Sequence, residues 1–216
     1  MHSIYRFIRL DKNKGGSLFH NLRFRNQKKC KYCFPETRGQ LRNRKSIHNR
    51  QIEIEGRTRF GDLEIDMIVG MKQQRSLESI VDRKTGYLWL KNCSSSKAED
   101  VCHTAVHLLK PIKDQFKIIT ANNRKEFSLH EHVAQALEID WYFADPYSAW
   151  QRGTNENTNG LIRQYIKNGS DLSKYSDAYI SEITQRLNHR SRKRLGFKSP
   201  SQVLWQHHGV ALQILI

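Results

Sequence analysis

Apolar and acidic side chains alternate along residues 62–69. The odd positions are apolar and the first three even positions are carboxylates: Leu63, Ile65, Met67 and Val69 against Asp62, Glu64 and Asp66. A period of two predicts a β-strand with its carboxylates on one face. Two further apolar runs, residues 77–81 and 87–90, flank the segment DRKTG, which ends in Gly86 and suits a hairpin turn. We therefore expect three consecutive antiparallel strands.

Helical and strand patterns alternate after this hairpin. Ser96 with Glu99, and Ser128 with Glu131, have the spacing of capping boxes and predict two helix starts, and Pro111 ends the first helix. Short apolar runs predict strands over residues 116–120 and 139–144, and helices are expected over about 150–166 and 177–189. The order β-β-β-α-β-α-β-α-α predicts an α/β fold, a mixed five-stranded sheet covered by helices, as in a ribonuclease-H-like core.

Charge is distributed unevenly along the chain. The net charge is +16 over 216 residues, and residues 1–60 hold 16 Lys/Arg against 4 Asp/Glu, a net +12. We expect a basic, partly disordered N-terminal extension over residues 1–57 and a catalytic-type core over 58–210. A basic arm before a nearly balanced domain indicates a polyanion-binding segment, and a merely solvated tail is the alternative.

The basic residues expected to contact DNA fall into three groups. Phosphate contacts of this kind bind the backbone without reading sequence. Gln151 and Arg152 could meet a phosphate near a helix N-terminus, although capping would also explain them. The arm and the end of the last predicted helix supply the others: Arg23, Arg25, Lys28, Lys29, Lys31, Arg42, Arg44 and Lys45 in the arm, and Arg190 and Lys193 after the helix.

Several other classes of protein are disfavoured. No apolar run reaches 18 residues and the N-terminus lacks a signal-peptide core, so we expect no membrane partner and a cytoplasmic, nucleoid-associated protein. The chain has four cysteines, which suits a reducing compartment better than a disulfide framework. Cys30 and Cys33 form a lone CxxC, which is weak evidence for zinc, and His130 and His132 are expected on the surface.

Three polar positions are expected to converge in the predicted sheet. Asp66 lies on the first strand, Asn122 follows the fourth, and Glu156 lies on the helix after the fifth. First and fourth strands are neighbours in a ribonuclease-H-like sheet. Clustered oxygen ligands favour Mg²⁺ or Mn²⁺, and two such ions can support phosphoryl transfer. Glu64 and Asp62 share the face of Asp66 and are expected to be supporting or solvent-facing.

Four segments carry a resemblance to a known family: GDLEIDMIVG, VDRKTGY, TANNRKEF and DPYSAWQRGTNENTNGLIRQY. They resemble the catalytic domain of bacterial insertion-sequence transposases of the DDE type, which is similar to retroviral integrases. The resemblance runs from about residue 3, through LRNRKSIHNR, to LGFKSPSQVL. It implies a catalytic set of Asp66, position 122 and Glu156, with 33 residues between the last two, and Mg²⁺ or Mn²⁺ held by Asp66 and Glu156.

Two residues depart from the family pattern T-x-D-N-G-x-E-F. Asn122 replaces an aspartate, and one neutral oxygen in place of a carboxylate is expected to weaken metal binding. Arg124 replaces a glycine, which predicts backbone strain or an altered turn. Its guanidinium could also reach the carboxylates and partly replace a cation.

Three functional hypotheses follow from the resemblance and these departures. We favour a degenerate transposase that binds DNA, both element ends and target, with weak or no strand transfer. The alternatives are an active enzyme that tolerates Asn122 and a non-catalytic DNA-binding inhibitor of an intact transposase. The resemblance implies a homo-oligomer or a mixed oligomer with the intact enzyme. The family's N-terminal helix-turn-helix region has no counterpart here, so we also expect a truncated form.

Overall fold

The computed structural model describes residues 4–21, 41–71 and 75–208, and the chain divides into two compact units, residues 1–37 and 38–216. In the first unit, helix α1 (Ile4–Asn13) is followed by a 3₁₀ turn at Leu18–Asn21, and the Asp11 carboxylate accepts a hydrogen bond from the Leu18 N–H at 3.1 Å. The predicted DNA contacts Arg23, Arg25, Lys28, Lys29 and Lys31, and the pair Cys30 and Cys33, lie outside the described residues.

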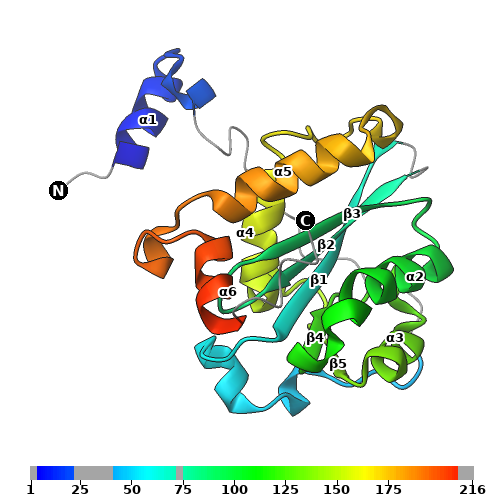
Figure 1. Ribbon diagram of the computed structural model, residues 1–216. Coiled ribbons are helices and arrows are strands. Elements are labelled where there is room, and N and C mark those ends of the chain that lie inside the picture. The colour runs from blue at the N-terminus through cyan, green and yellow to red at the C-terminus, as the bar shows by residue number, and fades with distance from the viewer. Residues whose placement is uncertain (1–3, 22–40, 72–74, 209–216) are drawn as a thin grey trace. The chain divides into compact units, whose positions relative to one another are not determined.

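The second unit is built on a mixed five-stranded sheet in the order β3-β2-β1-β4-β5 (Figure 1). β1, β2 and β3 pair antiparallel, whereas β4 lies parallel to both β1 and β5. The predicted α/β, ribonuclease-H-like sheet is thus confirmed, with Gly86 at φ +70° in the hairpin turn. The strands are β1 (Asp62–Val69), β2 (Ser76–Asp82), β3 (Leu88–Cys93), β4 (Ile118–Ala121) and β5 (Asp140–Phe143).

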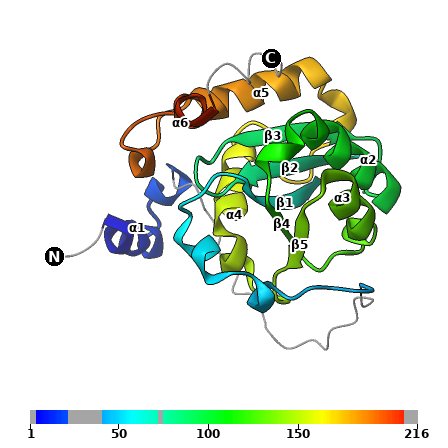
Figure 2. The same cartoon turned by 60° about the horizontal axis from the view of Figure 1, so that its bottom comes forward.

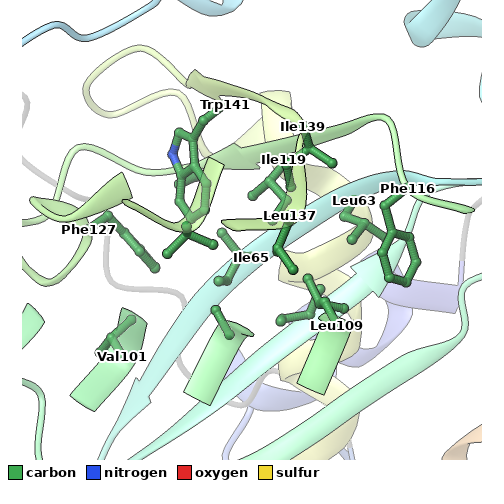
Figure 3. Packing of buried hydrophobic residues seen from close by; sticks show 14 of the residues in the cluster. Leu63, Ile65, Val101, Leu109, Phe116, Ile119, Phe127, Leu137, Ile139 and Trp141 are labelled. Atoms are coloured by element: carbon green, nitrogen blue, oxygen red, sulfur yellow. The ribbon is translucent and has the colours of Figure 1, made fainter. Parts of the chain in front are cut away.

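Helices cover both faces of the sheet (Figures 1 and 2). The apolar odd positions of β1 pack in one cluster with α2 (Ala98–Leu109) and α3 (His130–Leu137), as Figure 3 shows for Leu63, Ile65, Val101 and Leu137. The even face meets α4 (Gly153–Ile162) and α5 (Asp177–His189), which pack with Ile68 and the apolar residues of β2 and β3. The alternation along β1 therefore separates two buried faces, and its carboxylates point toward α4.

Both predicted capping boxes are wrong. Helix α2 begins after Lys97, and the hydroxyl that serves this turn is that of Ser95, which accepts from the Lys97 N–H at 3.1 Å. Helix α3 begins after Leu129 with no side-chain cap, because Ser128 ends a 3₁₀ turn, Lys125–Phe127. A final helix, α6 (Pro200–His208), was not predicted, since its sequence has little apolar periodicity.

The segment just before β1 packs on the second unit. Ser46 forms a parallel bridge with Phe143, whose N–H donates to the Lys45 carbonyl at 2.9 Å. Arg50 is 7% exposed and donates to the Thr120 hydroxyl at 3.0 Å. The domain boundary between residues 57 and 58 stays a prediction. Within the described ranges, no helix is both long and apolar enough to cross a membrane.

Candidate active site

The sheet brings Asp66 and Asn122 into direct contact. β1 and β4 run side by side with Glu64 opposite Thr120, so the residue two positions on from each strand partner falls at the same edge. The Asn122 Nδ2 atom donates to Asp66 Oδ1 at 3.0 Å. Glu156 is exposed on α4, one turn before Asn159, which does reach Asp66.

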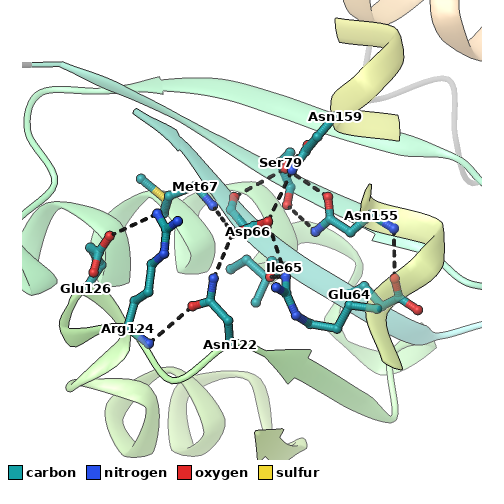
Figure 4. Close-up of polar contacts among 11 residues, drawn as sticks. Glu64, Ile65, Asp66, Met67, Ser79, Asn122, Arg124, Glu126, Asn155 and Asn159 are labelled. Carbon is teal, nitrogen blue, oxygen red and sulfur yellow. Dashed lines mark hydrogen bonds and ion pairs between the residues drawn. The ribbon is translucent and has the colours of Figure 1, made fainter. Parts of the chain in front are cut away.

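Four donors surround the Asp66 carboxylate (Figure 4). Oδ1 accepts from the Met67 N–H at 2.9 Å and from Asn122, and Oδ2 accepts from Asn159 Nδ2 at 3.2 Å. The Arg152 Nη1 atom lies 3.2 Å from Oδ2 and forms an ion pair with it. An ionised carboxylate offers about four acceptor positions, so the protein's own donors use them all.

The orientation of the Asn122 amide is fixed from both sides. Its Oδ1 accepts the Arg124 N–H at 3.2 Å while its Nδ2 faces Asp66. Exchanging the two amide atoms would set an oxygen against a carboxylate and an NH₂ against an N–H, and both contacts would be repulsive. Asn122 therefore presents N–H groups, and no oxygen, to Asp66.

Arg124 shows no backbone strain. Its φ is −88° and ψ is 152°, which any residue adopts, so the expected need for glycine is wrong for this backbone. Its guanidinium lies 3.8 Å from Glu126, not at Asp66. The guanidinium that does reach Asp66 belongs to Arg152, which the sequence suggested only as a phosphate contact.

Helix α4 is held to the sheet by asparagines. Asn155 is fully buried, and its Nδ2 donates to the Ser79 carbonyl at 3.4 Å. The Ser79 hydroxyl lies 3.1 Å from Asn155 Oδ1 and 2.9 Å from Asn159 Oδ1. Asn155 and Asn159 stand four residues apart, a spacing that places both on one helix face and could have identified them from sequence.

Glu64 and Asp62 are fully buried supports, so the expectation of solvent-facing carboxylates is wrong. Glu64 Oε2 accepts the Asn155 N–H at 2.8 Å, and Oε1 lies 3.5 Å from Arg83 Nε. Burial raises the pKa of Glu64, while Arg83 and the Asn155 N–H oppose the rise. Burial also raises the pKa of Asp62 against its contact with Arg59 at 2.8 Å. His130, expected on the surface, is 4% exposed and packs edge-on against Phe143.

The donor set does not fit a divalent cation as it is arranged. The acceptor positions of Asp66 are filled, Asn122 offers N–H groups, and the positive charge beside Asp66 is already that of Arg152. Among the residues that the structure describes, no three His, Cys, Asp or Glu side chains are grouped to hold a metal. The charge that a cation would neutralise is neutralised by the protein instead.

A cavity of about 250 Å³ opens beside this network. Asn122, Arg124, Asp145, Tyr147 and Arg152 contribute to its lining. Gln151 donates to Asp145 Oδ2 at 2.9 Å, and this contact is the main cause of the lowered pKa of Asp145.

The other predicted DNA contacts lie on the surface of the second unit. Arg44 lies 3.9 Å from the Asp145 carboxylate and Lys45 lies 2.7 Å from that of Asp140, while Arg42, Arg190 and Lys193 are exposed. DNA contact by these residues stays a prediction.

The relatives of this chain can now be set beside its geometry. The chain is 43% identical over 201 residues, 93% of its length, to the transposase for insertion sequence element IS4351 of Bacteroides fragilis. The chain is a relative of the insertion-sequence transposases. It is also 37% identical over 172 residues to the IS1086 transposase of Cupriavidus metallidurans and 34% identical over 167 residues to transposase InsI of IS30A from Escherichia coli. These two matches cover 79% and 77% of the chain.

This transposase relative spans only part of the proteins that it matches. It covers 62% of the IS4351 transposase, 51% of the IS1086 transposase and 43% of InsI. No model of a known protein family matches it.

Solved structures confirm the fold. A simian T-cell lymphotropic virus intasome in complex with the PP2A regulatory subunit B56 gamma matches with a TM-score of 0.56 at 18% identity, over 68% of this chain and 54% of the other. The catalytic core domain of BIV integrase matches with a TM-score of 0.53 at 18% identity, over 68% of this chain and 96% of the other. At that identity the likeness establishes an integrase-like fold.

Proposed function

We propose that this chain is a transposase-derived DNA-binding protein whose candidate active site performs metal-dependent strand transfer weakly or not at all. One observation carries the proposal: the Asn122 amide donates to Asp66 at the position where the family has a second carboxylate. In such a site Asp66 and Glu156 would hold Mg²⁺ or Mn²⁺ with the residue at 122 completing the set. Here the amide and Arg152 take the place of that charge.

DNA binding is proposed from charge and kinship together. The net charge of +16 is concentrated in the first 60 residues, and basic residues there release counterions when they neutralise phosphates. The relatives are named transposases, and one structural match is an intasome, so we expect this chain to act on DNA as an oligomer with itself or with an intact transposase.

The test compares the chain with Asn122→Asp in Mn²⁺ binding and in strand transfer. Mn²⁺ binding is measured by electron paramagnetic resonance, and strand transfer with a duplex made from the DNA that flanks the coding sequence. The added carboxylate repels Asp66 until a cation arrives, so we expect the variant to bind Mn²⁺ about 10- to 100-fold more tightly. Strand transfer should become detectable or rise by a similar factor. Adding Arg124→Gly should change little, because Arg124 has an ordinary backbone conformation.

Asn123→Asp is the matched control. It makes the same chemical change one residue away, where the Asn123 side chain donates to the Ala144 carbonyl and does not face Asp66. It should gain no Mn²⁺ affinity. Strand transfer by the unmodified chain at the level of Asn122→Asp would overturn the proposal. If both bind DNA and Mn²⁺ yet neither acts, the loss of activity does not lie at position 122.

A further inference from the structure

A second cavity, of about 190 Å³, lies where the N-terminus of α4 meets the β2–β3 turn. Its lining includes three arginines, Arg57, Arg192 and Arg194, together with Gly153 and Thr154. Thr154 and Asn157 of α4 line this cavity, whereas Asn155 and Asn159 of the same helix face Ser79 and Asp66. The cavity is thus separate from the candidate active site, although Glu156 lies between two of its lining residues in the sequence.

The arginines are positioned by neutral backbone groups. Arg194 Nη1 donates to the Lys84 carbonyl at 2.9 Å, and Arg192 Nη2 donates to the Leu187 carbonyl at 3.2 Å. Arg57 adopts a left-handed backbone, φ 52°, where its N–H bonds to the Ile54 carbonyl and ends a 3₁₀ turn. These contacts orient the side chains without cancelling their charge.

Positive charge is concentrated in this cavity. Among the described residues that line it, none is Asp or Glu. Burial lowers the pKa of Arg194, and the neighbouring charge of Arg57 lowers it further. The buried acids that act on Arg194 are engaged elsewhere, since Asp82 accepts from the Thr85 N–H at 2.7 Å and Glu64 pairs with Arg83.

Thr154 is an independent sign that the cavity takes a ligand. The residue is 6% exposed, and its Oγ1 atom is buried without a hydrogen-bond partner. A buried hydroxyl without a partner costs free energy unless a ligand completes it. Helix α4 also has no side-chain cap at its N-terminus, and a Cβ added at Gly153 would stand 3.8 Å from Arg57 Nη2.

We infer that Arg57, Arg192, Arg194 and Thr154 form a phosphate-binding pocket, whose occupant is a backbone phosphate of bound DNA. Guanidinium groups match the oxygens of a phosphate in pairs, a hydroxyl adds a donor, and the helix N-terminus favours an anion. The identity of the occupant as DNA rests on the proposed function. The pocket itself rests on these residues alone, and free phosphate is the other source of the same chemistry.

The first experiment uses inorganic phosphate and Thr154→Val on the full chain. Removing a hydroxyl that has no partner should leave the melting temperature in phosphate-free buffer unchanged or slightly higher. The same change should weaken protection by phosphate about tenfold or more, because a hydrogen bond to a charged ligand is lost. Sodium chloride at equal ionic strength controls for general screening, and Thr154→Ser should restore the protection.

The second experiment measures binding of a short duplex of arbitrary sequence across a range of salt concentrations. Arg194→Gln should lower the slope of log affinity against log salt by about 1, the effect of one phosphate contact. Arg186→Gln is the matched control, since Arg186 is exposed on α5, pairs with Glu182 at 2.6 Å and lies outside the pocket. Its slope should match that of the unmodified chain.

The two experiments separate the pocket from its occupant. Equal phosphate protection of the unmodified chain and Thr154→Val, or no protection of either, would overturn the pocket. Protection that depends on Thr154, with equal DNA slopes for Arg194→Gln and Arg186→Gln, would overturn DNA as the occupant in favour of free phosphate. A chain that does not bind the duplex at all would refute the proposed function, while the phosphate titration would still decide on the pocket.

Discussion

The two faces of the β1–β2 pair treat buried acids differently. Glu64 on β1 and Glu78 on β2 are both fully buried. Glu64 faces α4, where Arg83 and the Asn155 N–H meet it. Glu78 faces α2, and its contact is the Cys93 thiol, 3.6 Å away. Burial raises the pKa of both carboxyls, but the rise at Glu78 is larger because only a weak thiol donor opposes it.

The difference shows how one sheet can carry acids on both sides. On the α4 face, charge is kept by supplying cations and amides, and the candidate active site belongs to this face. On the α2 face, a neutral carboxylic acid is packed among apolar side chains. The comparison can be tested by removing a partner, a carboxyl and a thiol in turn.

The largest effect is expected from Arg83→Met. Arg83 is 2% exposed, and its loss leaves Glu64 buried without its nearest cation. Breaking a buried ion pair in this way should lower the free energy of unfolding by about 3–5 kcal/mol, measured by urea denaturation. Arg186→Met removes an exposed arginine from its pair with Glu182 and should cost about 0.5 kcal/mol or less. A loss at Arg83 as small as the loss at Arg186 would mean that Glu64 does not depend on its cation.

Glu78→Gln should change how stability depends on pH. The folded-state pKa of Glu78 is raised, so its contribution is fully present below the unfolded pKa of about 4.3 and is lost as pH rises through the folded value. In that window this single proton makes the free energy of unfolding fall by up to about 1.4 kcal/mol per pH unit. The variant should flatten this slope and be more stable than the unmodified chain at the alkaline end.

Exposed Glu99 provides the control for that experiment. Glu99→Gln changes the net charge equally without touching a buried group, and its pH profile should follow that of the unmodified chain. Parallel profiles for Glu78→Gln and the unmodified chain would show that Glu78 is not held as a neutral acid.

The smallest effect is expected from Cys93→Ser. Burial raises the pKa of Cys93 to about 12, so its thiol stays protonated and donates weakly to Glu78. A hydroxyl is a stronger donor, so the folded pKa of Glu78 should fall and the alkaline loss of stability should shrink by about 1 kcal/mol. The measurement is the same urea series across pH. An unchanged profile would mean that the partner at position 93 does not set the charge of Glu78.

Local patterns predicted the sheet well. The alternation of Asp62, Glu64 and Asp66 with apolar residues follows from the two-residue period of a strand, and the order of the elements then determines which strands are neighbours. The contact between Asp66 and Asn122 follows from that order. What covers the acidic face could not be read from residues 62–69, because α4 lies about 90 residues further along the chain.

The failed predictions have physical reasons. The capping boxes at Ser96 and Ser128 rested on spacing alone, and each helix begins two residues later than the spacing suggests. The strain expected at Arg124 was taken from the family's glycine, whereas the backbone there has φ −88°. That Arg152 pairs with Asp66 depends on tertiary geometry and had no signal in the sequence.

Asp66 is neutralised by its own chain, and this affects how the protein reaches its folded form. A cluster of carboxylates repels itself until a cation arrives, so its folding depends on the ions around it. Here the donors of Asn122, Arg152 and Asn159 meet Asp66 as soon as β1, β4 and α4 come together. The residue that weakens chemistry at position 122 thereby frees folding from the supply of divalent ions, and a chelator should leave the folded population unchanged.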